Sequence, residues 1–325
     1  MPEPIRIGAL GCSSVARRRS LPAIVASEAL RLTAVASRDA SKADAFATAF
    51  DCAPTDYAGL LARDDIDAVY LSLPTGRHVE WGRRVLAAGK HLLVEKPIAT
   101  RAAGARELAD LADRHGLVVR ENFTFLHHAQ QRTVAELIAG GRLGPVRSCS
   151  AEFCFPALPA DDIRYRPDLG GGALLDAGVY PIRLAQLLFG DDQRVAGAAL
   201  HHDPDTGVDV AGEALLVSGG GVSTSIRFGF QHSYGACYAI WGRDARLRVE
   251  RAFTPPPSLA PRLELTEQDH AEQLTLRPDD QFRRCAESFA SAIAAGDPAA
   301  ERDRREASVR TLELVDGIRA AAVEY

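Results

Sequence analysis

The sequence predicts an α/β fold in two domains: a doubly wound parallel sheet, then an α+β domain with a large, mainly antiparallel, open sheet. Three observations support this prediction. Short apolar strands alternate with helical patterns up to about residue 122, an order typical of parallel sheets. Longer alternating runs follow from about residue 145, as in antiparallel strands. The 325 residues exceed the size at which one core keeps growing, so we expect domains at 1–122 and 123–325.

Hydrophobic periodicity locates the elements of the first domain. Its expected strands are the apolar runs 5–10, 32–36, 68–73, 91–94 and 117–119. Apolar residues recur at helical spacing in the intervening stretches 17–27, 79–88 and 102–114. Strands joined through helices run parallel, because each crossover returns the chain to the same end of the sheet.

The second domain is expected to combine strands with three helices. The strands are 146–155, 195–201, 213–217, 222–230, 236–241 and 247–249, and the helices are 179–188, 281–294 and 306–322. Gly219, Gly220 and Gly221 separate two of these strands, as in a hairpin turn. An open antiparallel sheet leaves a face that must be covered. We therefore expect a homodimer or homotetramer that assembles through this sheet.

Composition and charge argue against several classes of protein. With 46% hydrophobic and 25% charged residues and a net charge of −5, the chain resembles an ordinary soluble globular protein that binds neither nucleic acid nor membrane. No apolar run reaches bilayer-spanning length, so we expect a cytoplasmic protein. Six scattered cysteines lack a CxxC pair, and the histidine doublets at 127–128 and 201–202 lack zinc-motif spacing. Reduced thiols and no metal are expected.

The first strand runs into a loop that fits a dinucleotide pyrophosphate. Gly11 supplies the tight turn, and Ala16 is small enough for the following helix to pack closely. Ser13 stands where the fingerprint has its second glycine, so a plain strand–turn–helix remains the alternative. The N-terminus of the helix favours an anion. The expected cofactor contacts in this loop are Gly11, Cys12, Ser13, Ser14, Val15 and Ala16.

The end of the second strand predicts which dinucleotide binds. An NAD-selective fold carries Asp or Glu there, about 20 residues past the loop, whereas this chain has Ser37 and Arg38. A hydroxyl and a planar guanidinium suit a 2′-phosphate, and Arg38 also suits stacking on adenine, so we expect NADP, bound as NADPH. Arg18 is a further candidate phosphate contact, although a run of arginines such as 17–19 is equally typical of a solvated helix face.

The segment Glu95-Lys96-Pro97 is the strongest chemical signal. It follows the strand 91–94, and ligands of an open parallel sheet bind beyond the carboxyl ends of the strands. Pro97 ends the strand and fixes the turn. Lys96 is therefore the candidate catalytic residue. The alternative is an exposed lysine at a strand-to-helix turn.

These segments, together with Leu73-Pro74, His78 and the run 164–181 with its three glycines, resemble one oxidoreductase family. It is the family of glucose-fructose oxidoreductase, inositol dehydrogenase and the rhizopine catabolism protein (Gfo/Idh/MocA), and the resemblance runs essentially from end to end. Segments 121–128 and 251–256 are similar to its branch of dTDP-sugar 3-ketoreductases, which act in deoxysugar and antibiotic biosynthesis. The resemblance implies an NADP-binding Rossmann domain and a substrate-binding and oligomerisation domain.

The resemblance also implies roles for individual residues. Tyr57 would lie near the adenosine and Leu73, Pro74 and His78 near the nicotinamide and its ribose. Further cofactor contacts would come from Glu95, Lys96, Arg164 and Asp176. Asp176 equally suits an N-cap of the helix that begins near Gly178. The nucleotide sugar would be faced by Lys96, Tyr180, Tyr234, Phe253 and Thr254.

Reduction of a ketone requires a proton donor for the developing alkoxide. Lys96 is favoured, because a lysine ammonium is protonated near neutral pH and its charge stabilises an alkoxide. Tyr180 is the competitor, because its phenol, with a reference pKa of about 10, would donate a proton if tuned by a neighbour such as Lys96. Many members of the family that the chain resembles have histidine at this position, a departure that leaves the choice of proton donor open. We expect Tyr180 to orient the ketone.

The implied reaction is NADPH-dependent reduction of the C3 ketone of a dTDP-3,4-diketo-2,6-dideoxyhexose. Oxidation of a free sugar or a trans-dihydrodiol is the alternative enzyme activity. A non-catalytic dinucleotide sensor is a third hypothesis, which the presence of both Lys96 and Tyr180 disfavours.

Overall fold

The computed structural model describes residues 3–324, which form two compact units. The first unit runs to Thr124 and also includes Phe282–Val309. The second comprises Phe125–Gln281 and the chain from Arg310 onward. The first break in the chain thus lies two residues past the expected boundary at 122, and the segment 282–309 returns to the first unit.

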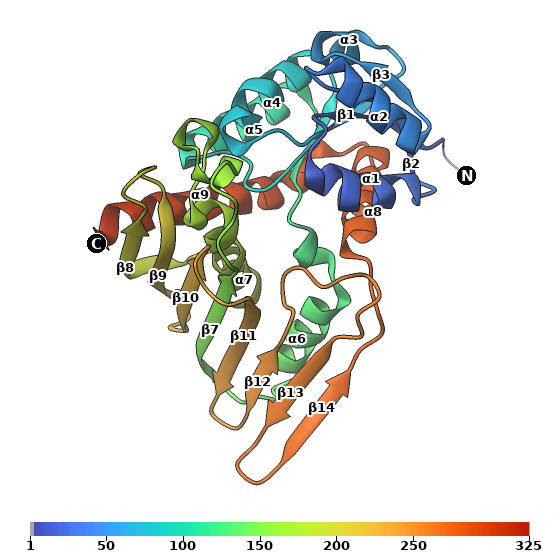
Figure 1. Cartoon of the computed structure of the whole chain (residues 1–325). Helices are drawn as coiled ribbons and strands as arrows, with labels where there is room; N and C mark the ends of the chain where they lie inside the picture. Colours follow the sequence, from blue (N-terminus) through green and yellow to red (C-terminus); the bar gives the residue numbers. More distant parts are fainter. Residues whose placement is uncertain (1–2, 325) are drawn as a thin grey trace. The chain divides into compact units, whose positions relative to one another are not determined.

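A six-stranded parallel sheet forms the centre of the first unit, with the order β3-β2-β1-β4-β5-β6 (Figure 1). Its strands are β1 (Ile5–Leu10), β2 (Leu30–Ala36), β3 (Ala53–Thr55), β4 (Ala68–Leu71), β5 (His91–Val94) and β6 (Val119–Glu121). All four residues of β4 are buried, as expected for a central parallel strand covered on both faces. The strand order reverses between β1 and β4, so their carboxyl ends form a topological switch point.

Five helices of the first unit connect these strands, and local caps fix several of their ends. They are α1 (Leu21–Val25), α2 (Ala40–Phe50), α3 (Tyr57–Ala62), α4 (His78–Ala87) and α5 (Ala102–His115). The side chain of Asp39 accepts a hydrogen bond from the Lys42 amide at the start of α2, and Asp56 caps α3 in the same way. Helix α5 ends at Gly116, whose φ of 63° suits glycine.

Helix α8 (Gln281–Ala294) packs into the core of the first unit from Phe282 onward. Its residues Ala286, Phe289 and Ala290 share one apolar cluster with Ile7 of β1 and Leu93 of β5. We expected this helix in the second domain, and the structure corrects that assignment. Amphipathic periodicity shows that a helix has a buried face but not which sheet buries it.

The second unit contains a nine-stranded sheet with the order β14-β13-β12-β11-β7-β10-β9-β8-β15. Its strands are β7 (Val146–Cys154), β8 (Arg194–His202), β9 (Asp209–Val217), β10 (Ser223–Gly229), β11 (Gly235–Gly242), β12 (Arg246–Val249), β13 (Arg262–Thr266), β14 (Ala271–Thr275) and β15 (Ala322–Glu324). The pairs β7–β10 and β8–β15 are parallel, and the other neighbours are antiparallel. The expected mainly antiparallel sheet is confirmed.

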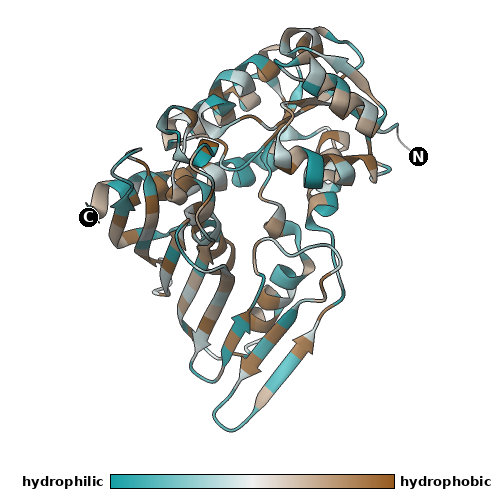
Figure 2. Ribbon diagram, in the orientation of Figure 1, coloured by the Kyte–Doolittle hydropathy of each residue, from teal (hydrophilic) through white to brown (hydrophobic). Residues whose placement is uncertain are grey.

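Alternation along the strands distinguishes a covered face of this sheet from an open face. In β11, Ala236, Tyr238 and Ile240 are buried, whereas Cys237 and Trp241 lie on the other face. Figure 2 shows hydrophobic and hydrophilic residues alternating in the same way along β13. The hydroxyl of Tyr238 donates to Gln131 of α6 (Ala129–Ala139) at 2.7 Å, so α6 packs on the covered face.

Two more helical segments complete the second unit. A π-helical turn (Leu174–Gly178) runs directly into α7 (Val179–Phe189), and both pack on the covered face of the sheet. Helix α9 (Arg302–Ala321) begins among residues of the first unit and ends in the second. Within residues 3–324, no helix combines the length and the hydropathy needed to cross a bilayer.

The structure adds strands that the sequence did not indicate. The expected hairpin at Gly219–Gly221 is present between β9 and β10, where Gly221 has a φ of 81°. In contrast, β3, β13, β14 and β15 were not expected; each has five residues or fewer, and none is a run of buried apolar residues such as the equally short β4.

Candidate active site

Gly11 lies at the switch point of the parallel sheet. Its φ is 105°, its amide donates to Ala36 at the end of β2, and its carbonyl accepts from the Ser72 hydroxyl at 2.8 Å. A Cβ atom at this position would lie 2.9 Å from both Ser72 O and Leu73 Cδ2. Only glycine fits here, which confirms the predicted tight turn after β1.

Ser13 does not act as a glycine substitute but as a helix cap. Its hydroxyl accepts from the Ala16 amide at 3.1 Å, and its carbonyl accepts from Arg17 at 3.0 Å. Ala16 is the first residue of a π-helical turn (Ala16–Ser20) and is fully buried. The loop therefore has the geometry in which backbone amides at a helix start can approach a pyrophosphate. Cys12 is buried, whereas the exposed Ser14 accepts from Arg18 Nε at 3.4 Å.

Ser37 and Arg38 follow β2, as predicted, and the structure adds an aromatic pair beside them. Burial raises the pKa of the Tyr57 phenol, an effect partly offset by the charge of Arg38 and a hydrogen bond to it. The ring of Trp81 in α4 lies edge-on to Tyr57 with centroids 4.8 Å apart. Arg38 is exposed beside Tyr57. Sequence reasoning missed Trp81, because α4 is remote from the fingerprint loop along the chain.

The imidazole ring of His78 links two loops: the loop that contains Leu73 and the loop that contains Lys96 and Pro97. Its Nδ1 lies 2.8 Å from the Pro97 carbonyl oxygen and its Nε2 lies 2.8 Å from that of Leu73. The ring is 1% exposed. Burial lowers the pKa of His78, and the charge of Lys96 lowers it further, whereas the two carbonyls act in the opposite direction. Lys96 itself is half-buried and precedes a cis peptide bond to Pro97.

Glu95 turns into the core rather than outward beside Lys96. Its Oε1 accepts from the Tyr70 hydroxyl at 2.6 Å, from Asn122 Nδ2 at 2.7 Å and from the Ser20 hydroxyl at 3.4 Å. Burial, followed by the charge of Glu95, raises the pKa of Tyr70 well above its ordinary value. This network joins the ends of β5 and β6, so it holds the strand end that presents Lys96.

Arg164 and Asp176 form an ion pair in the second unit. Arg164 Nε donates to Asp176 Oδ2 at 2.6 Å, and Nη1 donates to Asp162 at 3.2 Å. The charge of Asp176 raises the pKa of the Arg164 guanidinium above its ordinary value. Asp176 lies inside the π-helical turn and does not cap it, so the alternative capping role is wrong.

Tyr180, in the first turn of α7, lies in a cluster of aromatic rings. Its ring centroid is 4.9 Å from that of Phe153, 5.6 Å from Phe253 and 5.7 Å from Phe125. Tyr180 is 9% exposed and Phe253 is fully buried. Phe253 therefore packs against Tyr180, and its ring has no exposed surface for a sugar nucleotide in this structure. The cluster fixes the position of the phenol ring.

Tyr234 and Thr254 lie together on a separate, exposed patch. Their hydroxyl oxygens are 3.4 Å apart, and the guanidinium of Arg251 lies 4.7 Å from the Tyr234 ring centroid. Arg251 has a φ of 51°, which is unusual for a residue with a side chain. Buried amides hold the adjoining backbone: Gln130 and Gln131 donate to the Ala252 carbonyl, and Gln281 donates to that of Phe253.

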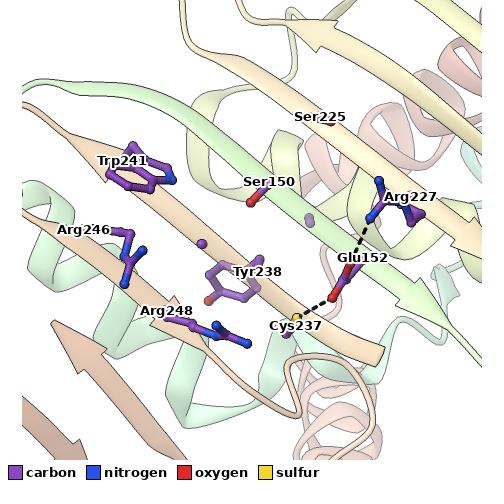
Figure 3. Close-up of a pocket in the computed structure, with 11 residues that line it drawn as sticks. Ser150, Glu152, Ser225, Arg227, Cys237, Tyr238, Trp241, Arg246 and Arg248 are labelled. Atoms are coloured by element: carbon purple, nitrogen blue, oxygen red, sulfur yellow. Dashed lines mark hydrogen bonds and ion pairs between the residues drawn. The ribbon is translucent and has the colours of Figure 1, made fainter. Parts of the chain in front are cut away.

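A cavity of about 340 Å³ opens on the other face of the nine-stranded sheet (Figure 3). It is lined by open-face side chains of β7, β10, β11 and β12, including Glu152, Arg227, Trp241, Arg246 and Arg248. None of the residues predicted to bind cofactor or substrate lines it. Phe153 alternates with Glu152 along β7 and faces the covered side, whereas Tyr238 also lines the cavity although its hydroxyl donates to Gln131 of α6. The cavity therefore belongs to the open face rather than to the candidate active site.

Two family models match the chain. An oxidoreductase family with an NAD-binding Rossmann fold, Gfo/Idh/MocA, matches residues 5–123. The C-terminal domain of the same family matches residues 131–248. In the part of the chain that the structure describes, no three His, Cys, Asp or Glu residues gather as a metal site.

Curated and solved relatives match along the whole chain. A dTDP-3,4-didehydro-2,6-dideoxy-α-D-glucose 3-reductase from Streptomyces violaceoruber is 46% identical, over 98% of this chain and 95% of the relative. One of the same name from Actinomadura kijaniata is 45% identical, over 98% and 96%. A crystal structure of a 3-ketoreductase from Actinomadura kijaniata with NADP and TDP-benzene has a TM-score of 0.96 and 45% identity, covering 99% of this chain and 98% of the other.

Proposed function

The chain belongs to the Gfo/Idh/MocA family of oxidoreductases, and on that basis we propose that it is an NADPH-dependent sugar 3-ketoreductase. Its substrate is a dTDP-3,4-diketo-2,6-dideoxyhexose, and its product carries a hydroxyl at C3. The observation that supports this most directly is the 45–46% identity to two 3-reductases over 98% of the chain. The alternative of a non-catalytic sensor is disfavoured by the presence of both Lys96 and Tyr180.

Lys96 is proposed as the proton donor. When bound, NADPH supplies the hydride that reduces the C3 carbon. Lys96 follows β5 at the edge where parallel sheets bind ligands, and its ammonium gives a proton to the C3 oxygen as negative charge develops there. The Glu95 network and the two contacts of His78 hold the backbone on either side of this lysine.

Tyr180 is proposed to orient the ketone. Three surrounding rings fix its phenol. Solved structures of the Actinomadura 3-ketoreductase include one variant with a lysine replaced and one with a tyrosine replaced. The two replaced residues are as far apart along that chain as Lys96 and Tyr180 are here. This equal spacing supports the pairing of Lys96 and Tyr180 in one reaction.

The cofactor is proposed to be NADPH, held chiefly by residues of the first unit. The described geometry fits this group, because the tight turn at Gly11 leads from β1 into a helix start capped by Ser13, where backbone amides favour a pyrophosphate. Ser37 and the exposed Arg38 suit the 2′-phosphate, with Tyr57 beside them for the adenosine. Arg18, Arg164 and Asp176 stay proposed contacts.

The nucleotide end of the substrate is proposed to bind at Tyr234, Arg251 and Thr254. Tyr234 is 46% exposed, so its ring offers a face for a pyrimidine base. Arg251 supplies positive charge for a diphosphate. The amides of Gln130, Gln131 and Gln281 keep the backbone of this patch in place.

The open face of the nine-stranded sheet is proposed to be covered by a second copy of the chain, in a homodimer or homotetramer. Leu215 and Trp241 on this face are 42% and 49% exposed beside the charged side chains that line the cavity, and exposed aromatic and arginine side chains are enriched at interfaces. The compartment is proposed to be the cytoplasm, since all six cysteines are free thiols.

The reaction is tested by following the absorbance of NADPH with an enzymatically prepared dTDP-3,4-diketo-2,6-dideoxyhexose. Wild-type protein is expected to oxidise NADPH quickly and NADH slowly. Replacement of Lys96 by Ala is expected to lower kcat roughly 100- to 10,000-fold, and Tyr180→Phe is expected to lower it less. Turnover of free sugars or dihydrodiols with NADP⁺, without turnover of the diketohexose, would overturn the assignment.

A further inference from the structure

Asp209 reaches from the sheet of the second unit to the start of the helical segment that carries Tyr180. It is the first residue of β9 and is 9% exposed. Its Oδ2 accepts a hydrogen bond from the Leu174 amide at 2.5 Å. Ala173, the residue before that turn, makes no capping hydrogen bond with its own side chain. A carboxylate that is distant in sequence therefore caps the helix.

The backbone of Gly172, just before the capped turn, passes close to this carboxylate. Gly172 has a φ of 113°, and a Cβ on it would lie 2.3 Å from Asp209 Oδ1. The close approach leaves no space for a side chain at 172. The chain thus passes the Asp209 carboxylate immediately before entering the helix.

The capped segment holds two residues of the proposed site. The π-helical turn (Leu174–Gly178) continues into α7 without a break. Asp176 lies in its first turn, where it binds Arg164. Tyr180 follows four residues later, which places both residues on the same side of the helical segment. A shift of the helix start would therefore move both side chains.

We propose that Asp209 is a positioning residue for this reaction: its ionised carboxylate fixes the start of the helix and thereby the placement of Tyr180 and Asp176. Asp209 touches neither substrate nor cofactor in this role. The inference rests on the proposed function insofar as Tyr180 orients the ketone.

Burial disfavours the ionised form of this carboxylate. Burial raises the pKa of Asp209 to about 6, whereas the Leu174 amide and the charges of Arg319 and His202 lower it. Arg319 lies in α9 and His202 in β8, opposite Asp209 in the strand pair. Perturbed carboxylates of this kind gather at functional sites. The acid form accepts a weaker hydrogen bond from Leu174 than the carboxylate does, so the placement of Tyr180 should follow the protonation of Asp209.

Nuclear magnetic resonance of ring-labelled tyrosine tests the coupling without any substrate. The chain has seven tyrosines, and the Tyr180→Phe variant assigns the signal of Tyr180. In wild-type protein we expect this signal to shift with a midpoint near pH 6. The shift should be absent in Asp209→Asn and retained in His202→Gln and in the exposed control Asp205→Asn. A Tyr180 signal that does not titrate, or that titrates equally in Asp209→Asn, would overturn the proposal.

Kinetics then separate positioning from a purely structural role. In Asp209→Asn, kcat above pH 7 is expected to fall about 10- to 100-fold, and the Kd for NADPH is expected to rise with it, because Asp176 and its partner Arg164 are proposed cofactor contacts. The acid limb of wild-type kcat should be missing from this variant. An unchanged kcat would overturn the proposal. If wild-type protein does not turn over the diketohexose, the proposed function fails, and the tyrosine signal still decides the role of Asp209.

Discussion

Arg164 Nε donates to Asp176 Oδ2 over 2.6 Å and so ties the segment 162–172 to the helical turn that leads to Tyr180. This ion pair is partly buried, since the side chains of Arg164 and Asp176 are 37% and 22% exposed. Asp162 makes a second contact to the same guanidinium. Two carboxylates therefore hold the guanidinium of Arg164, and they fix the direction in which its other N–H groups point.

Loss of this tie is expected to reduce turnover. In Asp176→Ala, Arg164 loses its nearest partner, and we expect kcat/KM to fall about 10- to 100-fold through misplacement of the neighbouring groups. Asp168→Ala is the matched control, because Asp168 pairs with Arg166 in the same segment and both are exposed. The control should stay within about twofold of wild type, since exposed pairs contribute little. Equal effects of the two substitutions would contradict the assigned role.

Cofactor choice is expected to depend on Arg38. Arg38→Ala should raise the KM for NADPH about 10- to 100-fold, which corresponds to the loss of one charge-assisted hydrogen bond to a phosphate. The KM for NADH should change little, because NADH lacks the 2′-phosphate. Arg31→Ala, an exposed arginine near the opposite end of β2, is the control. Steady-state kinetics with both cofactors measure the effect, and a parallel loss with NADH would show that Arg38 acts on the adenine or the fold.

The stability of the protein is expected to fall as pH rises through the titration of Asp209. Burial raises the pKa of this group to about 6, compared with about 3.9 in an unfolded chain. The folded chain holds the proton of Asp209 more tightly than the unfolded chain does. The share of the free energy of unfolding that this tighter binding supplies is therefore complete below about pH 4 and is lost as pH rises through about 6. It amounts to about 3 kcal/mol. Urea unfolding across this range should show the fall in wild type and not in Asp209→Asn.

Assembly is expected to depend on the open face of the nine-stranded sheet. A charge at Trp241, which is 49% exposed and stacks on Arg246, should shift a dimer or tetramer toward monomer. Light scattering after gel filtration compares Trp241→Glu with Val25→Glu, which alters an exposed residue of α1. If both variants keep the wild-type mass, this face is not the interface.

Local patterns predicted the parts of the fold that depend on nearby residues. Gly11, Ala16 and the strand ends at Ser37 and Lys96 lie where periodicity and turn chemistry placed them. Such signals work because a buried parallel strand is apolar on both faces and its ends carry the polar residues.

Long-range packing explains what the sequence did not indicate. Helix α8 joins the first unit through Phe289, and no periodicity reports which sheet buries a helix. Asp209 lies 35 residues from the amide it caps, beyond the reach of capping signals. Glu95 turns inward to Tyr70 and Asn122, partners contributed by neighbouring strands of the sheet.

The fate of the transferred hydride tests the central claim most directly. Protein supplied with NADPH deuterated at C4 and with the dTDP-3,4-diketo-2,6-dideoxyhexose should give a product that carries deuterium at C3 of the sugar. The Lys96→Ala variant should give far less of this product under the same conditions. Deuterium found at C4 of the sugar, or retained entirely in the cofactor while wild-type protein is saturated with substrate, would contradict the assignment as a 3-ketoreductase.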